Sequence, residues 1–463
     1  QVLIALADAR GQVLSREDLL QQCWGGRIVG VDAVNRAVAE VRRIVDAAEA
    51  GFQVETVPRV GYRLSGIDWN NQPEPSAPDV RMSLLGRRRL VVGAAAVIAT
   101  AGAGLAAFLG RQGRSEVDEL IERGRLVQAS GGPGNDQKAA IWFRQAIGRD
   151  PRRADAWGWL AVVLAEPGRA REAAHRALAL DPKEPNARTL LAFQRRDLDA
   201  WTQWEDALLG VLADAPDCAA ALSHLTLFYQ GMGRCSDSWL TNERAISIEP
   251  FNPGHQSRRA LKHWIFGRVG DADKVADHAL QLWPRDSIVW NARMLTYAFT
   301  NRASAAIALL DDVGSRPANL TPPSIASWRA ALQAIGTGSP LDVRRAVETC
   351  TAAASLAPGL AANAIMTFSH IGEVDAAFRV AEGLFEGRGT VVQRQRGSGL
   401  KDLYSGSTWG RTQFLFIPAT AAFRADGRFS ELCQKLGHVA YWRRRKIWPD
   451  DFVRGAIDPA QLT

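Results

Sequence analysis

Four polar side chains near the N-terminus have the types that contacts with DNA require. Asn35, Arg36 and Arg42 stand in one stretch, and Arg59 follows a proline some way further along the chain. An asparagine amide can make two hydrogen bonds to adenine, and an arginine guanidinium can pair with guanine or with a phosphate. These residues can act together only if the elements around them present them on one surface.

No other pattern in the chain predicts chemistry. None of the seven histidines is spaced with Cys, Asp or Glu in the manner of a metal site. The sequence has neither a glycine-rich phosphate loop nor a nucleophile elbow. We therefore predict that the protein is not an enzyme and holds no metal and no cofactor.

Length and composition predict several folded parts. A chain of 463 residues is long enough for two or more domains, and 47% of its residues are hydrophobic, so most of it can bury a core. The net charge of +7 is small for this length and does not by itself indicate nucleic-acid binding.

Apolar spacing predicts three helices at the start of the chain. Val2 and Leu6 belong to one face of the first helix. Ser15 suits the N-cap of the second, with Asp18 three positions later as in a capping box. The third runs from about residue 32 to residue 46, and its inner face is formed by Val34, Val38, Val41 and Val45.

A hairpin follows these helices. The run "FQVETV" alternates as a strand, Pro58 to Gly61 predict a turn, and "GYRL" returns as a second strand. Three helices and then a hairpin is the order of a winged helix-turn-helix.

At this point the sequence resembles a known family. The stretches "LSREDLLQQCWGG", "VDAVNRAVAEVRRIV" and "VETVPRVGYRL" resemble the C-terminal DNA-binding domain of OmpR/PhoB-type regulators, and most of all its membrane-bound ToxR/CadC-like branch. The resemblance covers residues 1–65. In that family a small antiparallel sheet precedes the first helix, so we expect a truncated domain here.

The resemblance implies which groove each candidate would contact. The third helix would enter the major groove, which makes Asn35, Arg36 and Arg42 candidates for base or backbone contacts. The hairpin would act as the wing, and Arg59 at its tip would contact a phosphate or the minor groove.

Two features depart from the family. Arginines that members often carry before the position of Val41 are replaced here by Ala39 and Glu40. Residues 1–66 also balance eight Lys or Arg against eight Asp or Glu. A neutral domain attracts phosphate weakly, so we expect tight binding to need a dimer or tandem sites.

The next segments predict a membrane anchor. Residues 67–86 are rich in polar residues and proline and read as a linker. The segment 90–110 carries no charge and is long enough to cross a hydrocarbon core of about 30 Å. Because the arginine triplet 87–89 is the denser flank, we expect a single-pass inner-membrane protein with a cytoplasmic N-terminus. A buried helix of a soluble domain is the alternative.

Small residues recur along this predicted span. Ala95, Ala99, Ala103 and Ala107 stand at every fourth position and would form a ridge along which two spans can pack. This spacing favours a homodimer, although an alanine-rich composition would produce such spacings by chance.

Beyond residue 115 the chain repeats itself. Five prolines recur at intervals of 31, 34, 34 and 34, and five positions before each stands a small or β-branched residue. A period of 34 with a proline after the second helix is the tetratricopeptide pattern. The prolines are Pro151, Pro182, Pro216, Pro250 and Pro284, and the preceding residues are Ala146, Ala177, Val211, Ala245 and Ala279.

The repeats and the tail set the limits of the last two predicted domains. Pro317 and Pro358 suggest weaker repeats, so we expect tetratricopeptide-like helices over residues 115–385 and a helical cap over 386–463. The stretch "YWRRRKIWP" in the tail is an alternative binding patch. Cys218 and Cys235 should lie at opposite ends of one helix, too far apart for a disulfide.

Together these patterns predict a mostly α protein with a truncated N-terminal winged helix-turn-helix (residues 1–66), one transmembrane helix (90–110) and a C-terminal α-solenoid. The predicted function is a one-component transmembrane transcriptional regulator that binds promoter DNA through its cytoplasmic winged helix. Its periplasmic solenoid would sense a signal or bind an unknown protein or peptide partner. The alternative is a membrane-anchored scaffold whose winged helix does not bind DNA.

Overall fold

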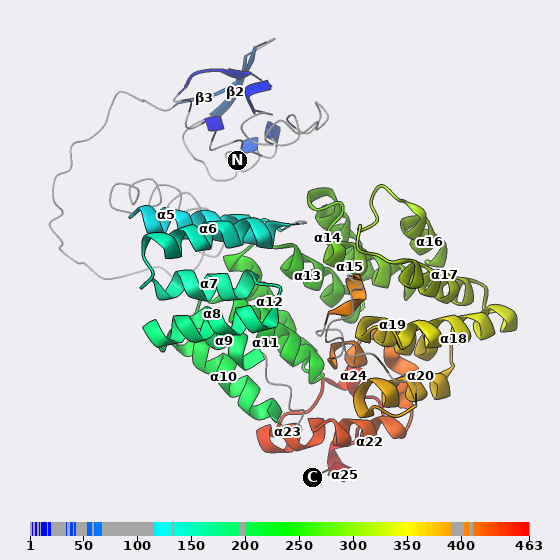
Figure 1. Cartoon of the computed structure of the whole chain (residues 1–463). Helices are drawn as coiled ribbons and strands as arrows, with labels where there is room; N and C mark the ends of the chain where they lie inside the picture. Colours follow the sequence, from blue (N-terminus) through cyan, green and yellow to red (C-terminus); the bar gives the residue numbers. More distant parts are fainter. Residues whose placement is uncertain are drawn as a thin grey trace, which may run out of the picture. The chain divides into compact units, whose positions relative to one another are not determined.

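The computed structural model describes the C-terminal part of the chain almost throughout and the N-terminal part at scattered positions. Within residues 1–66 it describes positions 2, 5–6, 9, 11–15, 17–19, 34, 38–39, 41–42, 53–57 and 60–66. Beyond them it describes residues 115–131, 134–193, 200–389, 392, 402–406 and 411–462. The chain divides into two compact units, residues 1–114 and residues 115–463 (Figure 1).

The N-terminal unit contains a three-stranded antiparallel sheet. Strands β2 (Gln53–Val57) and β3 (Gly61–Ser65) form the predicted hairpin, in a register that pairs Thr56 with Tyr62. The short strand β1 (Leu14–Ser15) pairs with the other edge of β3, so the sheet order is β1-β3-β2. The hairpin prediction is confirmed, whereas β1 had no signal in the sequence because so short a strand shows no periodicity.

The core of this unit confirms the predicted helix faces at their described residues, whereas Val45 lies outside the described residues. Ser15 also caps the helical residues that follow it: its Oγ accepts from Asp18 N, and Asp18 Oδ2 accepts from Ser15 N, both at 3.0 Å. This is the expected capping box. The apolar residues buried together are Val2, Ala5, Leu6, Leu19, Val34, Val38, Val54, Tyr62 and Leu64, with Leu14 and Val41 packed against them.

The C-terminal unit is a solenoid of paired antiparallel helices, coloured from cyan to yellow in Figure 1. The first five pairs are α5 (Glu116–Ala129) with α6 (Asn135–Arg149), α7 (Ala154–Val163) with α8 (Pro167–Leu180), α9 (Pro185–Phe193) with α10 (Trp201–Asp214), α11 (Ala219–Gly231) with α12 (Cys235–Ile248), and α13 (Pro253–Ile265) with α14 (Val269–Leu282). Three further pairs follow: α15 (Ser287–Ala298) with α16 (Ala303–Asp311), α17 (Pro322–Thr337) with α18 (Pro340–Ala354), and α19 (Pro358–His370) with α20 (Val374–Ala381).

The repeat pattern seen in the sequence has a direct structural cause. Helices α8, α10, α12 and α14 begin at Pro167, Trp201, Cys235 and Val269, and so keep the period of 34 that the prolines show. The residue five positions before each proline is buried, and its carbonyl accepts a hydrogen bond from the amide that ends the helix. In one example, Asp181 N donates to Ala177 O at 2.8 Å. A proline follows directly and cannot continue the helix. The tetratricopeptide-like prediction is confirmed.

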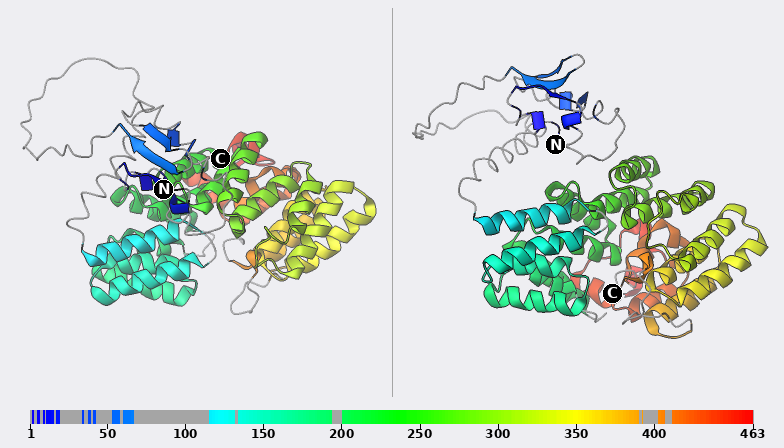
Figure 2. Two further views of the ribbon diagram at one scale, coloured as in Figure 1. Left: turned by 90° about the horizontal axis from the view of Figure 1, so that it is seen from above. Right: turned by 45° about the horizontal axis from the view of Figure 1, so that its top comes forward.

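The C-terminal tail returns along the solenoid. After a π-helical turn (Glu382–Glu386) its elements are η4 (Leu403–Ser405), η6 (Gln413–Phe416), η7 (Pro418–Thr420), α21 (Ala421–Ala425), α22 (Arg428–Lys435), α23 (His438–Arg445), α24 (Asp451–Arg454) and α25 (Pro459–Leu462). In Figures 1 and 2 these orange and red elements lie between the stack of α7–α10 and the stack of α17–α20.

Hydrogen bonds fix the tail to helices that stand much earlier in the chain. Trp201 Nε1 donates to Leu436 O at 2.7 Å, and Trp442 Nε1 donates to Met232 O at 3.0 Å. Gln230 Nε2 donates to Phe416 O at 2.9 Å. Buried side chains from α10 through to Ile457 form one continuous core. The tail predicted as a cap is thus, in its described residues, built into the middle of the solenoid.

The predicted membrane span requires a correction. Residues 90–110, their flanks and the alanine ridge lie outside the described residues, and so does the predicted linker 67–86. Among the helices that the structure does describe, none is long and apolar enough to cross a membrane. This finding overturns the fold class with one transmembrane helix and the inner-membrane location. The fold class is instead mostly helical, with a small N-terminal sheet and a C-terminal tetratricopeptide-like solenoid.

Candidate nucleic-acid interface

The hairpin motif "GYRL" is explained residue by residue in the sheet. A Cβ added to Gly61 would stand 1.8 Å from the carbonyl oxygen of Leu14, so only glycine lets β1 approach β3. Tyr62 and Leu64 point into the core and are almost fully buried. Arg63 points to the opposite face, as the alternation of a strand requires. The motif is therefore a packing requirement of the wing.

A cross-strand ion pair holds the outer face of the hairpin. Arg63 on β3 lies opposite Glu55 on β2, and Arg63 Nε lies 2.8 Å from Glu55 Oε2. The hydrogen bond from Arg63 lowers the pKa of the Glu55 carboxyl below its ordinary value. The charge of Arg63 is thus matched within the hairpin, and this arginine adds little positive potential to the wing.

Arg42 connects the third predicted helix to the sheet. Its Nε donates to Val54 O at 2.9 Å, and its Nη2 donates to Thr56 Oγ1 at 2.6 Å. Both acceptors belong to β2, so the guanidinium holds the helix at a fixed distance from the wing strand. The sequence analysis predicted that Arg42 contacts DNA, and no observation tests that prediction. The structure shows that Arg42 also positions the hairpin.

Three of the four predicted DNA contacts, Asn35, Arg36 and Arg59, lie outside the described residues, and their roles stay predictions. The described residues on either side of Arg59 are joined by one hydrogen bond, from Val60 N to Val57 O at 3.1 Å. The Val60 side chain is 55% exposed.

Among the described residues, no group of His, Cys, Asp or Glu could hold a metal ion. The four described cysteines are buried and form no disulfide. Cys218 stands directly before α11 and Cys235 opens α12, as predicted. The expectation that this pair does not bridge is confirmed.

Sequence reasoning missed a buried ionic network between the solenoid and its tail. Arg234 Nη1 lies 2.7 Å from Glu205 Oε1 and donates to the Tyr441 hydroxyl at 2.6 Å. Arg445 Nε lies 2.7 Å from the other oxygen of Glu205. Burial raises the pKa of Tyr441 above its ordinary value, so its hydroxyl stays protonated at neutral pH. Only the run "YWRRRKIWP" pointed to this region, and it gave no sign of the partners.

The N-terminal geometry agrees with what comparison with known proteins finds. Residues 1–64 match the family described as "Transcriptional regulatory protein, C terminal". The chain carries such a domain at its N-terminus. The transcriptional regulator HilA of Salmonella typhimurium is 33% identical over 64 residues, and so is HilA of Salmonella paratyphi A. Each alignment covers 14% of this chain and 12% of the relative, so the likeness concerns this domain alone.

Solved structures resemble the solenoid. A tetratricopeptide repeat protein from Parabacteroides merdae is 15% identical, with a TM-score of 0.34, over 51% of this chain and 91% of its own. A thermophilic tetratricopeptide repeat protein from Thermus thermophilus is 19% identical, with a TM-score of 0.30, over 42% of this chain and 99% of its own. The assignment of the repeats rests on the helix pairs and their regular period rather than on these scores.

Proposed function

We propose that this protein is a DNA-binding transcription regulator whose solenoid binds a protein or peptide partner. The observation that carries the proposal is the match of residues 1–64 to a transcriptional regulatory domain, together with a sheet whose wing motif is built as that domain requires. Asn35, Arg36 and Arg42 would contact the major groove or the backbone, and Arg59 would contact a phosphate or the minor groove.

The solenoid supports the second half of this proposal. Paired helices stacked at a regular tetratricopeptide period form extended surfaces whose usual use is protein or peptide recognition.

A second candidate is a scaffold whose winged helix does not bind DNA. The observation in its favour is the charge balance of residues 1–66, eight basic against eight acidic, to which the internal Glu55–Arg63 pair belongs. A domain with so little net positive charge would release few counterions from DNA, and counterion release drives most non-specific DNA binding.

Selection from a random DNA pool distinguishes the two candidates. A regulator should enrich one sequence or a pair of half-sites, and the enriched site should bind more tightly than a shuffled duplex at the same salt concentration. A scaffold should enrich none.

A further inference from the structure

A short stretch of the tail, Asp402–Ser405, lies against the solenoid in the way a bound peptide would. Leu403–Ser405 form the single turn η4, which contacts α19. Asp402, Leu403 and Tyr404 are each less than 9% exposed. Side-chain hydrogen bonds join Asp402 and Tyr404 to the solenoid helices α15 and α17 and to the turn before α17.

The acidic end of this stretch occupies the start of α17. Asp402 Oδ2 accepts from Thr321 N at 2.9 Å and from Ser324 Oγ at 2.7 Å. A carboxylate is favoured at this place because the first amides of a helix lack intrahelical partners and carry a partial positive charge. The backbone next to Asp402 is also hydrogen-bonded to the solenoid, since Leu403 N donates to Asn319 O at 2.9 Å.

The aromatic end is buried between polar side chains of α15 and α17. Tyr404 is fully buried, and its hydroxyl accepts from Trp328 Nε1 at 2.7 Å and donates to Asn291 Oδ1 at 2.8 Å. Burial raises the pKa of this hydroxyl above its ordinary value, which keeps the donor proton in place. Indole donor and amide acceptor together specify a phenol, because phenylalanine would leave both of them without a partner.

The rest of the tail has anchoring contacts of its own. Thr412 Oγ1 donates to Gly231 O at 2.8 Å, and Phe416 O accepts from Gln230 Nε2, both on α11. The tail also contacts α19 further on, where Phe423 N donates to Ser369 Oγ at 3.0 Å. None of these hydrogen bonds uses a residue that is hydrogen-bonded to Asp402–Ser405, so this stretch can leave its place without breaking them.

We propose that the surface formed by α15, α17 and α19 is a peptide-binding site for an acidic–leucine–tyrosine sequence, and that Asp402–Ser405 occupies it as an internal copy of the ligand. The partner is then a protein that displays the same three side chains in a segment able to form the same single helical turn. The inference rests on the proposed partner-binding role of the solenoid and does not involve DNA.

The test uses the full-length chain with the internal copy weakened by Asp402→Ser and Tyr404→Ala. The probe is a fluorescent peptide with blocked ends and the sequence Lys-Asp-Leu-Tyr-Ser-Gly, and binding is followed by fluorescence anisotropy. The weakened chain should bind it at least about ten-fold more tightly than the unmodified chain does. Further Ser324→Ala and Asn291→Ala changes should abolish the gain, whereas Ser315→Ala, which lies outside the site, should preserve it.

Peptide sequence and folding provide the controls. A peptide with asparagine for the aspartate and alanine for the tyrosine should not bind. If the weakened chain shows a native melting transition and binds neither peptide, or binds both equally, the proposal is overturned. Self-association of the chain that the peptide does not reverse would assign the surface to a second copy, and would overturn it as well.

A milder variant covers the case in which the double substitution prevents folding. In the Asp402→Asn chain, a peptide that keeps the tyrosine and carries a photoreactive benzophenone at the lysine position should label the solenoid more than in the unmodified chain. Equal labelling of the two chains would overturn the proposal. Since no DNA is present, a negative result leaves the proposed DNA binding untouched, and a failed DNA selection leaves this site untouched.

Discussion

Gly61 allows β1 to approach β3 closely because it has no side chain. Any larger residue would place its Cβ against the backbone of Leu14, which belongs to β1 and cannot move away as a flexible side chain can. We expect Gly61→Ala to separate β1 from β3 and to destabilise the N-terminal unit by about 1–3 kcal/mol.

Hydrogen exchange of residues 53–65, read by mass spectrometry in the full-length chain, measures this effect locally. The matched control is Val60→Ala, because Val60 is more than half exposed on the same hairpin. Unchanged protection in the Gly61→Ala chain would show that β1 does not depend on the close approach.

The candidate DNA contacts should fall into two classes when each is replaced. Arg59→Ala removes one charge that would sit on a phosphate, so binding to cognate and unrelated DNA should weaken alike and the salt slope should fall by about one contact. Asn35→Ala, if the amide reads adenine, should cost about 1–3 kcal/mol on the cognate site and little on unrelated DNA.

Salt titrations of binding to the two kinds of duplex separate these outcomes. Arg63→Ala is a suitable control, since Arg63 is matched by Glu55 within the hairpin. Identical effects of the Asn35 and Arg59 substitutions on both duplexes would contradict the assignment of one to the major groove and the other to the wing.

At the scale of single elements, a buried carboxyl makes the start of α9 sensitive to pH. Glu184 directly precedes α9 and accepts from Ala187 N at 2.6 Å, and its burial raises its pKa to about 7. The folded state therefore favours the protonated acid. The free energy of unfolding should fall as the pH rises from about 4.5 to about 7, by at most ~3 kcal/mol.

Replacement of Glu184 by glutamine should remove this decline. Urea unfolding at several pH values should show the Glu184→Gln chain gaining stability relative to the unmodified chain as the pH rises from about 4.5 to about 7. Glu166→Gln, at a well-exposed position, should show no such gain. A difference between Glu184→Gln and the unmodified chain that does not change with pH would contradict the raised pKa.

The elements also show what sequence reasoning can reach. Local signals predicted the hairpin, the capping box of Ser15 and the tetratricopeptide period, because alternation, capping and helix termination are written in residues that stand close together in the chain. They did not predict β1, which is too short to show a pattern. They also did not predict the return of the tail, because a contact between residues as far apart in the chain as Trp201 and Leu436 produces no periodic pattern in the sequence. The apolar run 90–110 predicted a span that the described helices do not support.

The whole C-terminal unit depends on the contacts that close the solenoid onto its tail. Arg234 lies at the centre of these contacts, with its side chain 9% exposed and Glu205, Asp237 and Tyr441 around it. Replacement of Arg234 by methionine should cost about 3–5 kcal/mol, because it leaves the Glu205 carboxylate buried with less compensation.

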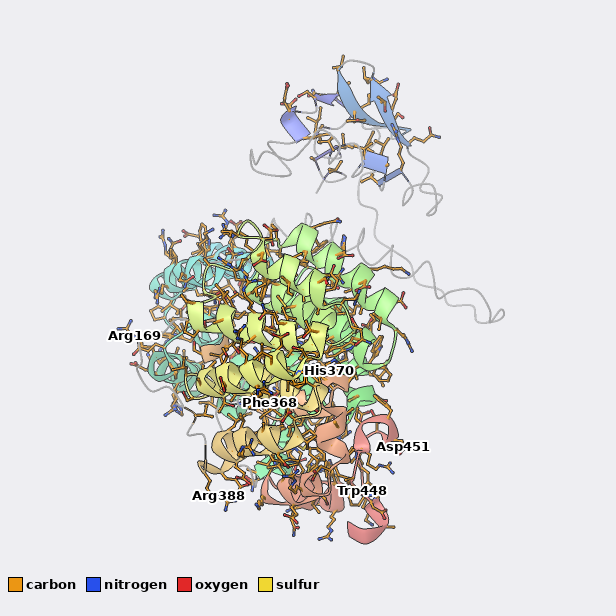
Figure 3. All side chains as sticks on the ribbon, turned by 90° about the vertical axis from the view of Figure 1, so that its right-hand side faces the viewer. Arg169, Phe368, His370, Arg388, Trp448 and Asp451 are labelled. Carbon is orange, nitrogen blue, oxygen red and sulfur yellow. The ribbon has the colours of Figure 1, made fainter. Side chains whose placement is uncertain are left out.

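An exposed arginine provides the comparison. Arg169, labelled at the surface in Figure 3, pairs with Glu166 in water, and Arg169→Met should change stability little. Chemical unfolding followed by tryptophan fluorescence reports on both variants, since Trp201 on α10 and Trp442 in the tail are both buried. Equal effects of the two substitutions would show that the buried network does not hold the unit together.

The central claim, that the protein reads DNA, is tested most directly by selecting sequences from a random duplex pool with the full-length chain at low salt. The account predicts enrichment of one motif or of two spaced half-sites, with binding to that motif tighter than to a shuffled duplex, and loss of the preference in the Asn35→Ala chain. A folded chain that enriches no sequence over successive rounds would contradict the account and would leave the solenoid as a scaffold.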